Sequence, residues 1–133
     1  MKYLLLNFFI FSLLIPVATT SANDLSISIT EPADDSKVEY REYVKGTVSD
    51  PLVEICVVIR PSETSVFWIQ PPVTVKKNGT WKVEVYFGRD GKDFGKEFEI
   101  RAYANPISNL SEGKSNRWPK AEAHSDVIDV IRE

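Results

Sequence analysis

The chain has 133 residues, with 16 Lys and Arg residues against 19 Asp and Glu residues and a formal net charge of −3. This mildly acidic balance gives no support to a nucleic-acid-binding protein or to a protein that binds an anionic membrane surface, because both need a basic face. Cys56 is the only cysteine, so no disulfide can form within the chain. A chain of this length is large enough for one domain with its own core.

The N-terminal segment has the three-part pattern of a secretory signal peptide. Lys2 supplies a positive start, residues 3–17 form an apolar run, and small residues follow up to Ala22. The run is shorter than the roughly 17–25 residues of a membrane-spanning helix, and Pro16 interrupts it. We expect cleavage after Ala22, with Ala18 as the second choice, and no stable membrane insertion afterwards. The mature protein is then exported to the periplasm, the cell surface or the medium. A retained N-terminal anchor is the alternative.

Four extended segments are predicted in the first half of the mature chain. Residues 25–30 alternate between apolar and polar side chains, which predicts a strand with one buried face. Residues 38–49 form a second extended segment, in which we expect Gly46 to mark a bend or a bulge. The almost continuously apolar run 52–59 predicts a central strand that is covered on both sides. A short strand at 66–70 follows.

The strongest local signal is the Asn78-Gly79 turn, which separates an extended segment at 73–75 from a strictly alternating one. One face of the second segment is apolar and the other is polar or tyrosine-bearing: Trp81, Val83, Val85 and Phe87 against Lys82, Glu84 and Tyr86. Asn-Gly followed by such alternation predicts a β-hairpin. We therefore expect Trp81 to be buried at the centre of the core.

The second half contains two more strands and two loops. A charged, glycine-rich loop at 88–96 leads into a strand at 97–105, and a long connection at 106–123 leads into a last strand at 127–131. The strand at 97–105 also alternates, with Phe98, Ile100, Ala102 and Ala104 on one face and Glu99, Arg101 and Tyr103 on the other. We interpret Trp118, in the long connection, as a lid over the end of the fold.

About seven strands without a convincing helix predict an all-β Greek-key sandwich for residues 23–133. This segment resembles the bacterial immunoglobulin-like domains of exported and surface proteins. The resemblance lies in ITEP at 29–32, VKGTV at 44–48, GTW at 79–81 and FEIRAYA at 98–104. It implies a spacer, adhesion or ligand-binding module, and it transfers no catalytic residue to this chain.

Signals of catalysis or metal binding are weak. Cys56 lies inside the most apolar strand, where a thiol is usually an inert hydrophobe, and His124 is the only other candidate partner. The acidic pair Asp34-Asp35 with Glu31 does not match a calcium-loop spacing, and neither does Asp90 with Asp93. We interpret both acidic groups as solvated turns and expect no enzyme, cofactor or metal site.

Aromatic residues are the best candidates for a binding surface. Tyr86 and Tyr103 have outward registers on their strands, and neighbouring strands would place them beside Arg101 as an exposed platform. Cross-strand pairs that stabilise the sheet are the alternative role for these rings, and Trp118 is the fourth candidate ligand-binding residue. The leading hypothesis is an exported, non-enzymatic, immunoglobulin-like domain that binds an envelope or extracellular protein or serves as a structural module. The alternative is a small carbohydrate-binding module that uses outward aromatic rings.

Overall fold

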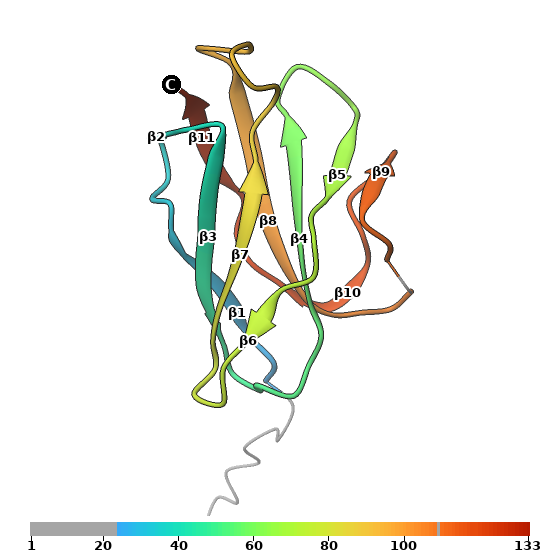
Figure 1. The fold of residues 1–133 in the computed structure, drawn as a ribbon. Coiled ribbons are helices and arrows are strands. Elements are labelled where there is room, and N and C mark those ends of the chain that lie inside the picture. The colour runs from blue at the N-terminus through green and yellow to red at the C-terminus, as the bar shows by residue number, and fades with distance from the viewer. Residues whose placement is uncertain (1–23, 109) are drawn as a thin grey trace, which may run out of the picture.

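The computed structural model describes residues 24–108 and 110–133. The predicted signal peptide, residues 1–22, lies outside the described residues. All regular structure in the described part is β-strand, and the strands form two packed sheets (Figure 1). The prediction of an all-β sandwich is confirmed.

The sandwich contains eleven strands, whereas the sequence predicted about seven. The strands are β1 (Ile27–Glu31), β2 (Ser36–Val38), β3 (Arg41–Val48), β4 (Ile55–Pro61), β5 (Phe67–Ile69), β6 (Thr74–Val75), β7 (Thr80–Tyr86), β8 (Glu97–Pro106), β9 (Gly113–Ser115), β10 (Ala121–His124) and β11 (Ile128–Arg132). The strand β6 corresponds to the extended segment predicted at 73–75, whereas β2, β9 and β10, each of three or four residues, were not predicted as separate strands. Elements this short are too brief to show a clear alternation.

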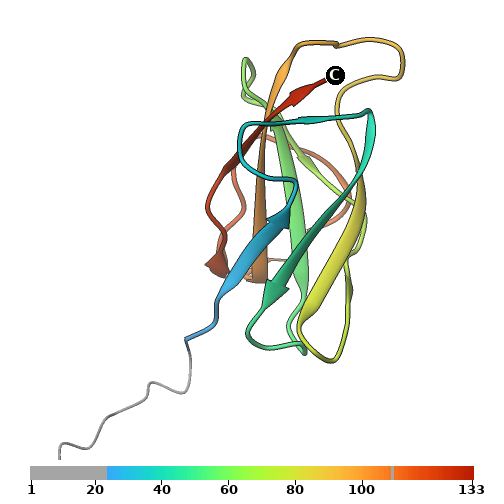
Figure 2. The same ribbon diagram turned by 90° about the vertical axis from the view of Figure 1, so that its left-hand side faces the viewer.

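The smaller sheet has the antiparallel order β1-β3-β7-β6, and the larger sheet has the order β2-β11-β8-β4-β5-β9. In the larger sheet only β2 and β11 pair in parallel. β4 occupies one edge of β8, so β10 and β11 lie one after the other along its opposite edge. Figure 2 shows the two layers, with β3 and β7 towards the right and β8 and β11 towards the left.

The main core lies between the two sheets and contains Trp81, as predicted. Gly46 faces this core from β3, opposite Trp81 in the register. A Cβ atom at position 46 would overlap both the Ser28 carbonyl oxygen and the Trp81 indole. Gly46 therefore makes room for the indole. The register irregularity expected there lies instead in the neighbouring strand β1, between Ile29 and Glu31.

The strand β4 is covered on both sides, as its apolar run predicted. Val57 and Ile59 belong to the main core, while Val58 points to the opposite face and is also fully buried. On that outer face Val58 packs in a second cluster with Phe67, Ile69 and Tyr103. Cys56 packs against the same cluster but is only half-buried, although it lies in the most apolar strand.

The predicted hairpin is present between β6 and β7. Gly79 has a φ of 84°, a left-handed conformation that glycine adopts without steric cost. The Asn78 Oδ1 atom accepts hydrogen bonds from the Thr80 N–H at 3.1 Å and from the Thr80 hydroxyl at 2.7 Å. The turn residues thus place the strict alternation of β7 in register, with Trp81 towards the core.

Candidate functional site

The structure separates the two tyrosines that were expected to form one platform. Tyr86 lies on β7 in the smaller sheet and is 40% exposed, whereas Tyr103 lies on β8 in the larger sheet and is 1% exposed. The outward faces of these sheets are on opposite sides of the sandwich, so the predicted Tyr86–Tyr103 platform is wrong. Alternation identifies the outward residues of each strand, but it does not say which sheet the strand joins.

Tyr103 is buried because the long connection after β8 folds back over the outer face of the larger sheet. Trp118 in this connection packs against Phe67 and Tyr103, with ring centroids 4.7 Å and 6.3 Å away. The Arg101 guanidinium lies 5.7 Å from the Trp118 ring, and its Nε donates to the Ser125 carbonyl at 3.1 Å. Arg101, Tyr103 and Trp118 therefore meet in a covered cluster. The lid covers a sheet face, rather than the end of the sandwich as expected.

Cys56 and His124 lie on either side of Tyr103. The register pairs Cys56 with Tyr103 and Tyr103 with His124, which places the thiol and the imidazole two strand spacings apart. Adjacent strands are about 4.8 Å apart, so this distance is too great for proton transfer between the two side chains. Burial also raises the pKa of the Cys56 thiol to about 11, which keeps it protonated at neutral pH.

A cleft of about 640 Å³ lies on the side of the sandwich where β5 faces β7. It exists because the smaller sheet is incomplete there, since β6 pairs with β7 only at Trp81 and Lys82. The strand β5 extends beyond this short sheet edge. Trp68 is opposite Ile59 in the register and so lies on the inner face of β5, where no strand covers it.

The cleft has an apolar floor and two aromatic walls. Ile59, Ile69 and Phe98 line its interior, and the walls are Trp68, which is 44% exposed, and Tyr86. The buried side chain of Gln70 connects the two sheets beside it. Its Nε2 donates to the Trp68 carbonyl at 3.1 Å, and its Oε1 accepts from the Tyr86 N–H at 3.4 Å. Tyr86 is thus a predicted candidate that lines the cleft, and Trp68 and Gln70 were not among the predicted site residues.

One rim of the cleft is the 88–96 loop, which is closed by a compact ion cluster. The Asp93 carboxylate accepts from the Arg89 backbone N–H at 2.9 Å, from the Arg89 guanidinium at 3.0 Å and from the Lys96 ammonium at 2.9 Å. Arg89 and then Lys96 hold the pKa of Asp93 well below its usual range. The carboxylate is almost fully covered, but both cationic side chains remain more than half exposed at the rim.

Arg132, a third residue that sequence reasoning missed, holds this loop in place. It is almost fully buried, and its Nη1 donates to the carbonyls of Phe87, Arg89 and Lys92 at 2.9, 3.1 and 2.9 Å. Its guanidinium also lies over the Tyr40 and Phe94 rings. A lone arginine in the last strand shows no sequence pattern that would reveal these contacts.

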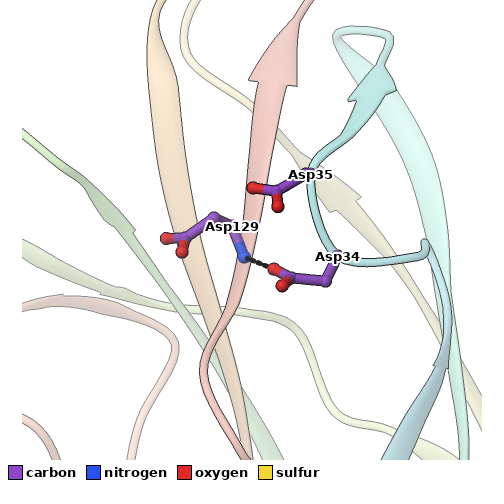
Figure 3. A group of neighbouring side chains, drawn as sticks. All are labelled: Asp34, Asp35 and Asp129. Atoms are coloured by element: carbon purple, nitrogen blue, oxygen red, sulfur yellow. Dashed lines mark hydrogen bonds between the residues drawn. The ribbon is translucent and has the colours of Figure 1, made fainter.

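An acidic cluster occurs on the opposite side of the sandwich, where the turn after β1 meets β11 (Figure 3). One carboxylate oxygen from each of Asp34, Asp35 and Asp129 lies within 4.8 Å of the others. The Asp34 Oδ1 accepts from the Asp129 N–H at 2.8 Å, and Glu31, the expected third member, pairs with Lys45 instead. Calcium takes about six to eight oxygens. The three carboxylates are exposed, and one of them is held by a backbone hydrogen bond.

Burial and the neighbouring carboxylates, Glu99 first among them, raise the pKa of Asp129. Both causes disfavour the charged form of the Asp129 carboxyl, burial more than the repulsion within this acidic surface. In the described part of the chain, the structure has no helix with the length and apolarity needed to cross a membrane. No protein-family model matches the chain, and no curated protein matches it significantly.

Proposed function

We propose that this protein is an exported, non-enzymatic, immunoglobulin-like domain that binds another envelope or extracellular protein in the cleft between β5 and β7. The observation that carries the proposal is the pair of half-exposed rings, Trp68 and Tyr86, that wall an apolar floor. Protein interfaces are typically anchored by a few aromatic or aliphatic side chains that fill such pockets. A partner's apolar side chain inserted here would complete the core where the smaller sheet ends.

The strand order supports the immunoglobulin-like part of the proposal. Immunoglobulin sandwiches place strands A, B, E and D in one sheet and G, F and C, with C′ in variable-type domains, in the other. The order β1-β3-β7-β6 opposite β11-β8-β4-β5 has the same arrangement. On this assignment β9 and β10 belong to an enlarged connection between the F-like and G-like strands.

The exported and non-enzymatic parts have separate support. Export rests on the signal-peptide pattern that ends at Ala22. The non-enzymatic role is supported by the spacing of Cys56 and His124 on either side of Tyr103 and by the raised thiol pKa. With export and a non-enzymatic role supported in this way, recognition of a partner at the surface is the function that we propose.

A binding experiment with two matched variants tests the cleft. Tagged wild-type protein, Trp68→Ala and Leu52→Ala are used to capture partners from an envelope extract, and the captured protein is then purified and titrated by calorimetry. Leu52 is a suitable control because it is 92% exposed and lies outside the residues that line the cleft. We expect Trp68→Ala to weaken binding at least tenfold and Leu52→Ala to leave it unchanged. Equal affinity of all three proteins would show that the cleft is not the binding site.

A small carbohydrate-binding module is the second candidate function. It is favoured by the outer face of the smaller sheet, where Tyr43 is 49% exposed and Tyr86 40% exposed. Flat aromatic rings on an open sheet face provide stacking surfaces for sugars. Tyr43→Ala distinguishes the two candidates, because it should reduce binding on a glycan array while leaving capture of a protein partner in the cleft unchanged.

A further inference from the structure

The outer face of the smaller sheet has a local charge that differs from that of the whole chain. Lys45 on β3 lies directly opposite Lys82 on β7 in the register. Both line a shallow recess of about 310 Å³ together with Lys76. The other residues that line this recess are four threonines, a glycine and a tryptophan: Thr30, Thr47, Thr74, Thr80, Gly46 and Trp81. Three lysines therefore line the recess with no acidic residue in its lining, while Glu31 and Glu84 on the same face pair with Lys45 and Arg41.

Like charges directly opposite each other on a sheet are unfavourable. Lys45 is partly compensated by Glu31, whose carboxylate is 3.4 Å from its ammonium in an exposed ion pair. Lys82 has no such pair in the described structure; its ammonium lies 5.3 Å from the centroid of the Tyr43 ring. Exposed contacts of these two kinds are worth little. An anionic group between Lys45 and Lys82 would relieve their repulsion.

Tyr43 extends the recess with a different kind of contact. It is two residues before Lys45 on the same face of β3, and its ring is half-exposed. The face thus combines, within a few residues, cations, hydroxyl groups and an open aromatic ring, and the carboxylate opposite Tyr43, that of Glu84, is paired with Arg41. A sugar ring with a carboxylate matches all three, since the acid pairs with ammonium groups, the hydroxyls pair with threonine, and the apolar ring face stacks on tyrosine.

We infer that the outer face of the smaller sheet binds an acidic polysaccharide of the uronic-acid class. In the proposed complex, a carboxylate of the polysaccharide lies between Lys45 and Lys82, and a neighbouring sugar ring of the same ligand stacks on Tyr43. This inference deepens the carbohydrate-binding candidate and rests on it. It does not involve the cleft walled by Trp68, because the residues of the recess and those of the cleft are different.

The test compares polygalacturonate with uncharged dextran as probes, in calorimetric titrations of the full mature chain at low and at high salt. We expect polygalacturonate to bind at least tenfold more tightly than dextran and to weaken as salt rises. Lys82→Glu should weaken polygalacturonate binding at least tenfold. This substitution places a carboxylate opposite Lys45, so the melting temperature should stay the same or rise. Lys37→Glu makes the same charge change on β2 in the larger sheet and should leave binding within twofold.

The possible outcomes distinguish failure of the acidic-polysaccharide inference from failure of the carbohydrate-binding candidate on which it rests. Equal binding of dextran and polygalacturonate would overturn the acidic class while leaving carbohydrate binding in place. Failure of both probes to bind would overturn both. Equal losses in Lys82→Glu and Lys37→Glu would assign the attraction to overall charge and overturn the site. Single-stranded DNA that binds as tightly as polygalacturonate, and is also lost in Lys82→Glu, would show a surface that accepts polyanions without recognising sugar.

Discussion

The two outer faces of this sandwich both carry tyrosines, but these side chains are exposed on one face and buried on the other. On the smaller sheet Tyr43 and Tyr86 are each about half-exposed, at 49% and 40%, and nothing in the described chain folds over them. On the larger sheet Tyr103 has the same outward register, but the connection between β8 and β10 covers it with Trp118. The larger sheet therefore has a core on both of its faces, whereas the smaller sheet has a core on one face only.

This difference shows that an outward position on a strand is not the same as an exposed position. Exposure depends on whether another segment of the chain is long enough, and apolar enough, to cross the face. The 106–123 connection satisfies both conditions, since Leu110, Trp118 and Ala121 all pack against the outer cluster. In the described part of the chain no comparable connection crosses the smaller sheet, so its outer face and the cleft along its edge are left uncovered.

The largest expected effect is that of Trp118→Ala on stability. The substitution removes the ring that packs on Phe67 and Tyr103 and exposes both of them to water. We expect a loss of about 3 kcal/mol in the free energy of unfolding, the low end of the range for truncating a core tryptophan, because Trp118 is itself partly exposed. Urea denaturation measures this loss. A loss below about 1 kcal/mol would show that the connection rests on the sheet without stabilising it.

The second prediction concerns thiols placed on the two faces. The pKa of Cys56 is raised from 9.0 to about 11 by burial, so its thiolate fraction is about 100-fold lower than that of an unperturbed thiol. Cys56 in the folded wild-type protein should therefore react about 100-fold more slowly with an alkylating reagent than the thiol of a Cys56→Ala, Tyr43→Cys double variant. In urea the two rates should become equal. Equal rates in the folded state would mean that the cover over the larger sheet opens freely.

Tyr103→Phe tests the covered face without disturbing its shape. The Tyr103 hydroxyl is buried and has no hydrogen-bond partner in the described structure. Its removal should stabilise the protein by up to about 1 kcal/mol, because the folded state no longer bears the cost of an unpaired polar group. A destabilisation of similar size would reveal a bridging water or a hydrogen bond to Arg101 instead.

Burial raises the pKa of Tyr103 from 10.0 to about 12, which gives the same residue a pH signature. Between these two values the unfolded chain releases a proton that the folded chain retains, so wild-type stability falls as the pH rises from 10 to 12. The Phe variant lacks this contribution and should show a shallower decline in that window. Urea titrations at several alkaline pH values measure the difference between the two slopes.

Local patterns predicted much of this fold. Three predicted features are present in the structure: the Asn78-Gly79 turn, the alternation of β7 with Trp81 inward, and the doubly covered β4. Each was predicted from a pattern of about ten consecutive residues. Whether these elements form depends mainly on residues that are close together in the sequence. Residue patterns of this kind can therefore be interpreted without knowing the partner strand.

The candidate sites depend on contacts between distant segments, and sequence reasoning largely missed them. Trp68 lines a cleft only because β6 ends after pairing with Trp81 and Lys82 and leaves the rest of the β7 edge uncovered. The Lys45–Lys82 pair depends on the register between β3 and β7. Tyr86 alone among the four predicted site residues stays exposed on a strand, since its alternation was interpreted correctly and no connection covers it.

The smallest expected effects come from the open face, and they complete the comparison. Tyr43→Ala removes a half-exposed ring whose centroid lies 5.3 Å from the Lys82 ammonium. We expect it to change the free energy of unfolding by less than about 0.5 kcal/mol, as is usual for surface positions. Tyr86→Ala should cost slightly more, because the Tyr86 ring also lies 5.4 Å from Tyr40 and 5.8 Å from the Arg41 guanidinium. Parallel urea titrations of both variants and Trp118→Ala measure the contrast. If Tyr43→Ala were as destabilising as Trp118→Ala, the tyrosines of the open face would serve the stability of the sheet, and their exposure would no longer favour a binding role.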